Sequence, residues 1–253
     1  MKKDNRRNHV MEKYRILRNI MENHNKDNIK CISITSNSDN EGKTTVAKNL
    51  AMSLAIYGRK TLFLDCSLGD NTRIESFDAD STRGLIGILR DIGKLKTQQL
   101  DREKTNEVSL KSYIKETKYE YLSIASLGEY NLDSYSLIFK TEYLKVVMKI
   151  LKKKFDYIII DAPSFSNLSY TQIITGATDG CLFVLKEGAN AVTEGGAIKD
   201  KINTVGCRIL GCVLNKEKDS TKLFGDKNNS FVDVKYPGRK KKVIMEKGAE
   251  IEA

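Results

Sequence analysis

The stretch Ser36–Ala51, "SNSDNEGKTTVAKNLA", joins a polar turn and the triplet Gly42-Lys43-Thr44 to a helical pattern. It directly follows the apolar run "CISITS" at 31–36, which is typical of a buried strand. A strand, a tight loop and a helix in this order favour phosphate binding, because loop N–H groups converge and the helix N-terminus adds partial positive charge. The alternative is a chance Gly-Lys-Thr at the start of a helix.

Each residue type in this loop has a chemical reason. Gly42 permits close approach of the backbone to phosphate, Lys43 can reach the β- and γ-phosphates, and the Thr44 hydroxyl can hold Mg²⁺. The motif G-x-x-x-x-G-K-[ST] expects glycine where Asn37 stands, and many related loops have glycine where Asn40 stands. Asparagine tolerates a left-handed backbone, so we expect the loop to close. The residues predicted to surround the phosphates are Asp39, Asn40, Glu41, Gly42, Lys43, Thr44 and Thr45.

Short apolar runs alternate with helical patterns along the chain. The predicted strands are 31–36, 61–66, 121–126, 157–162, 180–185 and 208–215, and the predicted helices between them are 43–58, 138–155 and 191–206. This alternation predicts an α/β fold with a mainly parallel central sheet and helices on both faces, the three-layer architecture of P-loop NTPases.

Two aspartates stand at the ends of predicted strands. Asp65 closes "TLFLD" and Asp161 closes "YIIID". Ligands bind at the carboxyl ends of strands in open α/β sheets, so both acids are expected beside the loop, where they could hold Mg²⁺ with Thr44. The alternative is that each aspartate caps the turn after its strand.

The bulk properties limit the class of protein. No apolar window is long enough for a membrane-spanning helix, and no secretory signal follows the charged N-terminus, so a cytoplasmic location is expected. The net charge of +10 indicates an acidic partner, with a merely solvated surface as the alternative. The five cysteines form no C-x-x-C pair and are expected in buried strands.

Three regions are expected along the chain. Residues 1–29 form an N-terminal helical segment, with the helix predicted at 9–24. Residues 30–215 form the nucleotide-binding domain, with a lysine-rich excursion at 92–120. Residues 216–253 form a basic, polar tail that is expected to be loosely ordered.

Several motifs occur in the order found in one known family. The sequence resembles the bacterial tyrosine kinases of capsule and exopolysaccharide synthesis, of the CpsD/CapB type, over about residues 10 to 216. The segments that carry the resemblance are "EKYRILR", the Walker A-like loop, the Walker A′-like "TLFLDCSLGDNTRIESF", "RGLIGILRD", the Walker B-like "FDYIIIDAPS" and "GCVLN".

The resemblance implies ATP and Mg²⁺ as ligands and Lys43, Asp65 and Asp161 as catalytic residues. Asp65 would orient or deprotonate a tyrosine hydroxyl, and Asn215 would lie near the adenine. Glu12, Arg15 and Arg18 would help subunits assemble into a ring; from the residues alone, Glu12 and Arg15 could simply pair with each other. The implied partner is a membrane-anchored activator, a polysaccharide co-polymerase, which would place the protein at the inner face of the membrane. Nucleic acid is not expected.

The sequence also departs from this family. Walker A′ normally reads D-x-D-x-R, whereas here Asp65 is followed by Cys66, Ser67, Leu68 and Gly69. The tail has no tyrosine cluster, and the tyrosines at 119, 121, 130 and 135 are either phosphate acceptors or ordinary surface and strand residues. A nucleotide-gated scaffold without kinase activity is therefore an alternative. A ParA/MinD-like ATPase is another, although its additional loop lysine is replaced by Ser38.

Overall fold

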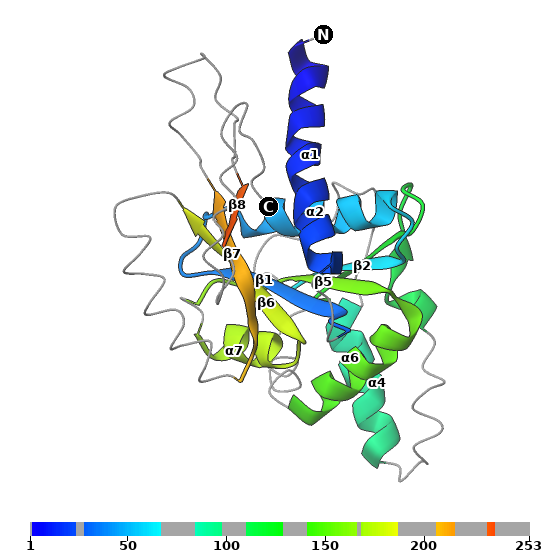
Figure 1. The fold of residues 1–253 in the computed structure, drawn as a ribbon. Helices are drawn as coiled ribbons and strands as arrows, with labels where there is room; N and C mark the ends of the chain where they lie inside the picture. Colours follow the sequence, from blue (N-terminus) through cyan, green and yellow to red (C-terminus); the bar gives the residue numbers. More distant parts are fainter. Residues whose placement is uncertain are drawn as a thin grey trace.

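A single twisted sheet forms the centre of the molecule (Figure 1). The computed structural model describes residues 2–23, 28–66, 84–97, 110–128, 141–165, 168–186, 206–215 and 232–235. The eight strands lie in the order β3-β4-β2-β5-β1-β6-β7-β8. Their bounds are β1 Cys31–Ser36, β2 Thr61–Asp65, β3 Lys115–Glu116, β4 Leu122–Ser126, β5 Tyr157–Asp161, β6 Gly180–Lys186, β7 Ile209–Asn215 and β8 Val232–Lys235. The strands from β4 to β7 pair in parallel, and only the edge strands β3 and β8 are antiparallel.

Helices cover both faces of this sheet. On one face lie α1 Lys2–Asn23 and α2 Lys43–Ile56; on the other lie α4 Gly84–Thr97, α6 Thr141–Lys154 and α7 Leu168–Gly176 (Figure 1). A short 3₁₀ helix, η2 Leu110–Ser112, precedes β3. The predicted three-layer α/β fold is therefore confirmed.

The strands are apolar on both faces because both faces are covered. All residues of β1, β2 and β5 are buried. Side chains alternate between the layers: Phe63 and Ile159 pack with the α1/α2 layer, whereas Leu62 and Ile158 pack with the α4/α6/α7 layer. This two-sided burial explains the continuous Ile, Leu and Val runs in the sequence.

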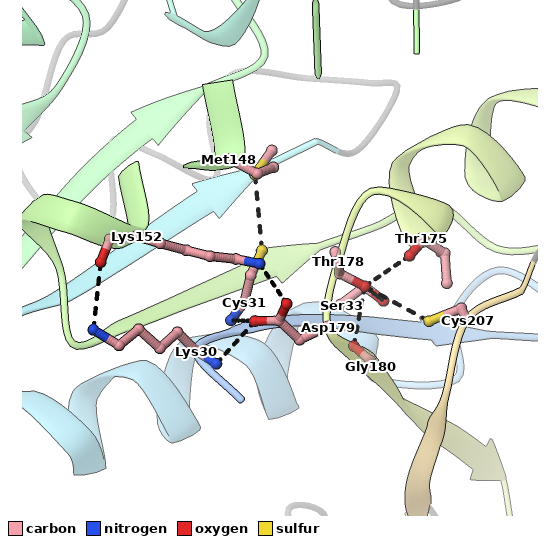
Figure 2. Close-up of polar contacts among 10 residues, drawn as sticks. All are labelled: Lys30, Cys31, Ser33, Met148, Lys152, Thr175, Thr178, Asp179, Gly180 and Cys207. Atoms are coloured by element: carbon pink, nitrogen blue, oxygen red, sulfur yellow. Dashed lines mark hydrogen bonds and ion pairs between the residues drawn. The ribbon is translucent and has the colours of Figure 1, made fainter. Parts of the chain in front are cut away.

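A carboxylate clamp holds the amino ends of the central strands together (Figure 2). The Asp179 carboxylate accepts hydrogen bonds from the backbone N–H groups of Lys30 (3.0 Å) and Cys31 (2.9 Å), and it pairs with the Lys152 ammonium of α6. Burial alone would raise the pKa of Asp179, but the Lys152 hydrogen bond and the two N–H donors give a net lowering. The clamp therefore connects β1, β6 and α6 at the amino ends of the strands, opposite the loop that follows β1.

Most predicted elements are found, with boundaries shifted by a few residues. The helix predicted at 138–155 is α6, and the one predicted at 43–58 is α2. The helix predicted at 191–206 lies outside the described residues. The tail, predicted to be loosely ordered, contributes β8, which pairs antiparallel with β7.

Two predictions from composition can also be compared with the fold. Four of the cysteines are buried, Cys212 is partly buried, and none forms a disulfide. No helix within the described ranges is long and apolar enough to cross a bilayer.

Candidate phosphate-binding site

The loop between β1 and α2 has the backbone conformation that the sequence predicts. Gly42 has φ +92° at the N-cap of α2, and Asn40 has φ +62°. Both values lie in the left-handed region, which glycine adopts freely and asparagine tolerates. The helix begins at once, since the Val46 N–H donates to the Gly42 carbonyl at 3.0 Å.

The glycine that the motif expects at position 37 is not needed here. Among the described residues, the non-glycine positions with positive φ are Asn28, Asn40 and Tyr121, so Asn37 has an ordinary backbone. Its N–H donates to the carboxylate of the buried Glu41 at 3.2 Å. The loop therefore closes on an internal hydrogen bond, and the departure at Asn37 does not break it.

Asn215 supports the loop from β7. Its Nδ2 donates to the Glu41 carbonyl at 3.0 Å. A Cβ atom placed on Gly42 would lie 2.0 Å from the same Nδ2. Glycine is thus required at 42 both by its φ and by this close approach. The sequence predicted Asn215 near the adenine, and this bracing contact was not foreseen.

Lys43 lies within the loop, where it contacts oxygen atoms. Its Nζ donates to the Ser38 carbonyl at 3.3 Å and lies 3.6 Å from the Asp39 carboxylate. The Ser164 hydroxyl, which follows β5, donates to Asp39 at 2.8 Å. Sequence reasoning missed Ser164; the only signal was its position three residues after Asp161. Together these contacts tie the loop to the β5 end.

Asp65 and Asp161 are brought together as predicted. They are direct partners in the parallel register of β2 and β5. Both continue the alternation of Phe63 and Ile159, so they occupy the α2 face of the sheet, the same face as the loop helix. Both side chains are buried. Thr44 lies in the first turn of α2, partly buried, and Thr45 is exposed.

This arrangement suits a cation that is bound together with a triphosphate. Mg²⁺ prefers hard oxygen ligands and usually takes only one or two carboxylates, with phosphates and water completing its shell. The two buried aspartates, with Thr44 in the first turn of the helix that covers the same face, supply oxygen ligands of this kind. The described residues contain no group of three or more His, Cys, Asp or Glu side chains that could hold a metal by itself.

The buried thiol of Cys66 offers no additional chemistry. Burial raises its pKa well above the usual value, and the neighbouring charges of Asp65 and Asp161 raise it further. The thiol therefore stays protonated at neutral pH. Ser67, Leu68 and Gly69, the other positions of the Walker A′-like segment, lie outside the described residues.

The predicted assembly residues differ in their surroundings. Arg15 and Glu12 are both exposed and pair with each other at 2.8 Å. Arg18 is buried: it donates to the Ser53 carbonyl at 3.3 Å, and its guanidinium lies 3.9 Å from the Tyr57 ring centroid. Arg15 and Glu12 are therefore available on the surface, whereas Arg18 docks α1 on α2.

Comparison with known proteins places this site in a family. The model of the AAA domain matches residues 29–215. The chain belongs to this AAA domain family. Its AAA domain spans the loop, both strand-end aspartates and Asn215.

The relatives of this AAA domain are bacterial tyrosine kinases. The chain is 27% identical over 223 residues to the CapB protein of Staphylococcus aureus, covering 88% of each. It is 29% identical over 201 residues to the tyrosine-protein kinase CpsD of Streptococcus agalactiae, covering 79% of this chain and 81% of CpsD. The crystal structure of the chimerical protein CapA2B2 matches with TM-score 0.66 and 26% identity, over 82% of this chain and 84% of that one. The resemblance predicted from the motifs is confirmed.

The AAA domain also shares its fold with a septum site-determining protein. The MinD of Pyrococcus horikoshii OT3, solved with Mg-ADP, has TM-score 0.56 and 24% identity, over 73% of this chain and 69% of that one. At this identity the likeness concerns the fold alone. The position of the additional lysine expected of that group is Ser38, whose carbonyl accepts from Lys43.

Proposed function

We propose that this chain binds ATP and Mg²⁺ and transfers the γ-phosphoryl group to protein tyrosine, in the control of capsular or exopolysaccharide synthesis. The observation that carries the proposal is the in-register pair Asp65 and Asp161 beside Gly42-Lys43-Thr44. The kinase names of its relatives support the reaction class. A membrane-anchored activator and a position at the inner face of the membrane are proposed with it.

Each residue of the candidate site has a separate role in the proposed phosphoryl transfer. The backbone N–H groups of residues 39–45 would bind phosphate oxygens, and the Lys43 ammonium would neutralise charge on the transferred group. Thr44 and Asp161 would hold Mg²⁺, which supplies further charge neutralisation when bound. Asp65 would orient the tyrosine hydroxyl and accept its proton. Asn215 would keep the loop in its binding conformation through the Glu41 carbonyl.

ATP binding is the first test. Lys43→Ala removes the ammonium beside the phosphates, so its ATP affinity should fall at least about tenfold, the scale of one lost charge-assisted contact. The matched control is Lys145→Ala on the exposed face of α6, which removes the same charge from the opposite layer of the sheet. Calorimetric titration with ATP and Mg²⁺ compares them. Equal affinity of the Lys43→Ala and unchanged chains would refute the proposal.

A nucleotide-gated scaffold of the same family is the second candidate. The observation that favours it is the sequence after Asp65, where Ser67 stands at the position of the second acid and Gly69 at that of the arginine. The same ATP affinity is expected in both cases. Incubation with ATP, Mg²⁺ and a Glu/Tyr copolymer, read by anti-phosphotyrosine blot, separates them: labelled copolymer excludes the scaffold, and bound ATP without label excludes the kinase.

A further inference from the structure

Most tyrosines of this sequence lie at or before position 170. Of its eleven tyrosines, only Tyr236 lies beyond Tyr170. We propose that the turn carrying Tyr119 and Tyr121 is the phosphorylation site of this chain and that it is modified by a second copy. This inference rests on the proposed function and names its protein substrate.

Exposure reduces the described tyrosines to three candidates. The buried ones are Tyr14, Tyr113, Tyr143, Tyr157 and Tyr170. Three are exposed: Tyr57 (57%), Tyr119 (38%) and Tyr121 (44%). A tyrosine must insert its hydroxyl into a foreign active site, so buried rings cannot react without unfolding. Tyr57 is restrained because the Arg18 guanidinium lies 3.9 Å from its ring centroid.

The turn between β3 and β4 presents its two tyrosines two positions apart, with Glu120 between them. The Leu122 N–H donates to the Tyr119 carbonyl at 3.1 Å, and the Thr61 N–H donates to the Tyr121 carbonyl at 2.8 Å. Tyr121 has φ +63°, a left-handed backbone that is uncommon for tyrosine. The main chain is therefore held by hydrogen bonds at both tyrosines, while both side chains remain exposed.

Charged side chains of both signs adjoin the two tyrosines. Glu120 lies between them, and the Lys118 ammonium lies 5.8 Å from the Tyr119 ring centroid. Glu120 also raises the pKa of the Tyr121 phenol by hydrogen bonding and charge. A tyrosine phenol is protonated at neutral pH even at its ordinary pKa, so the transfer needs a base, the role proposed for Asp65.

Geometry excludes reaction within one chain. Tyr121 precedes β4, whose Leu122 pairs with Thr61 at the start of β2, whereas Asp65 pairs with Ser126 at the far end. Four residue steps along a strand separate these ends by about 13 Å. The turn thus lies at the amino ends of the parallel strands, and the phosphate loop lies at their carboxyl ends. A rigid sheet cannot bring them together, so the enzyme must be another copy.

The transfer is balanced with ATP as the phosphoryl donor. The bond between the γ-phosphorus and the bridging β,γ-oxygen breaks, and a bond forms between that phosphorus and the tyrosine Oη. The phenolic proton passes to Asp65 of the enzyme copy and then to solvent, and ADP leaves. No oxidant, reductant or further co-reactant is required.

The test mixes two full-length chains with ATP and Mg²⁺. The acceptor is a tagged Lys43→Ala chain with both tyrosines intact, and the enzyme is a Tyr119→Phe/Tyr121→Phe chain. Peptide mass spectrometry should find an added HPO₃ on Tyr119 or Tyr121 of the acceptor. The matched control is an acceptor that also carries Tyr57→Phe, which removes the exposed tyrosine outside the turn and should be labelled as strongly.

Each outcome decides a different point. Labelling of the unchanged chain at other tyrosines only, or labelling of the copolymer but not of the chain, would overturn this inference and leave the proposed function intact. A chain that labels itself but never labels the acceptor would overturn the second-copy step. Label on neither chain nor copolymer would overturn the proposed function. Site mapping on the unchanged chain needs no variant, so misfolding cannot obscure the answer.

Discussion

Gly42 satisfies two demands at once, a left-handed backbone and the close approach of Asn215. Gly42→Ala should place a Cβ 2.0 Å from the Asn215 Nδ2 at φ +92°, and so abolish ATP binding. Gly58→Ala is the matched control, because Gly58 has φ +81° but nothing within 4 Å of its Cβ. Both variants should lose about 1–2 kcal/mol of unfolding free energy from the backbone alone. Thermal melts and ATP titration compare them, and ATP binding by Gly42→Ala at normal affinity would contradict the loop geometry.

Asn215 should affect the affinity for ATP without taking part in phosphoryl transfer. Asn215→Ala removes the donor to the Glu41 carbonyl, which contributes about 1 kcal/mol, so ATP binding should weaken about fivefold. Asn215→Asp keeps the size but replaces the donor with a charged acceptor facing a carbonyl, and it should weaken binding at least as much. The measurement is an ATP titration of both variants. Unchanged affinity in Asn215→Asp would show that the brace is unimportant.

The loop also shows which residues the sequence could predict. Gly42, Lys43 and Thr44 were identifiable because their spacing from the strand is fixed by the chemistry. Asn40 was correctly expected to tolerate a left-handed backbone. The carboxylate of Glu41 that binds the Asn37 N–H could not be predicted, because a side chain returning to its own loop leaves no periodic signal.

At the scale of elements, the Asp179 clamp joins two strands and a helix. Asp179→Asn should destabilise the fold by about 1–3 kcal/mol, since it removes a charged acceptor from two N–H groups and the Lys152 ammonium. Asp156→Asn is the control: this exposed carboxylate accepts one N–H, from Lys60 at 2.9 Å, so its loss should be smaller. Chemical denaturation measures both variants, and an equal loss would contradict the clamp.

The clamp should also be visible in the pH dependence of stability. The pKa of Asp179 is lower in the folded chain than in the unfolded one, so its stabilisation is complete above the unfolded value of about 4. As pH falls through the folded pKa, the carboxylate becomes protonated and the stabilisation is lost. The unchanged chain and Asp179→Asn should therefore differ at neutral pH and converge in acid. A difference that persists in strong acid would contradict this assignment.

Elements with a clear period were predictable, and short or glycine-rich ones were not. The buried strands were found because both faces are apolar. The sequence pattern did not predict helix α4, because it contains Gly84, Gly87 and Gly93 and glycine disfavours helix interiors. Helix α7 has nine residues, and β3 and β8 have two and four. Segments this short depend on tertiary pairing, which a sequence pattern does not record.

At the scale of the whole molecule, α1 carries two arginines with different expected roles: Arg18 supports folding, and Arg15 is predicted to support assembly. Arg15→Ala should leave the unfolding free energy within about 0.5 kcal/mol, because an exposed ion pair contributes little. Arg18→Ala should destabilise the monomer by removing the contacts to Ser53 and Tyr57. Thermal melts and sedimentation velocity with ATP would compare the two. Arg15→Ala is the cleaner test of assembly, and an undisturbed oligomer in that variant would count against the role predicted for Glu12 and Arg15.

The alignment of Asp65 with Asp161 limits how this chain could tolerate insertions. Because side chains in a strand point alternately to opposite sides, one extra residue between Thr61 and Asp65 would turn that aspartate toward the layer of α4 and α6. Lengthening a surface connection would leave both acids where they are. Insertions and deletions of residues should therefore be tolerated in the connections and rejected within β2 and β5.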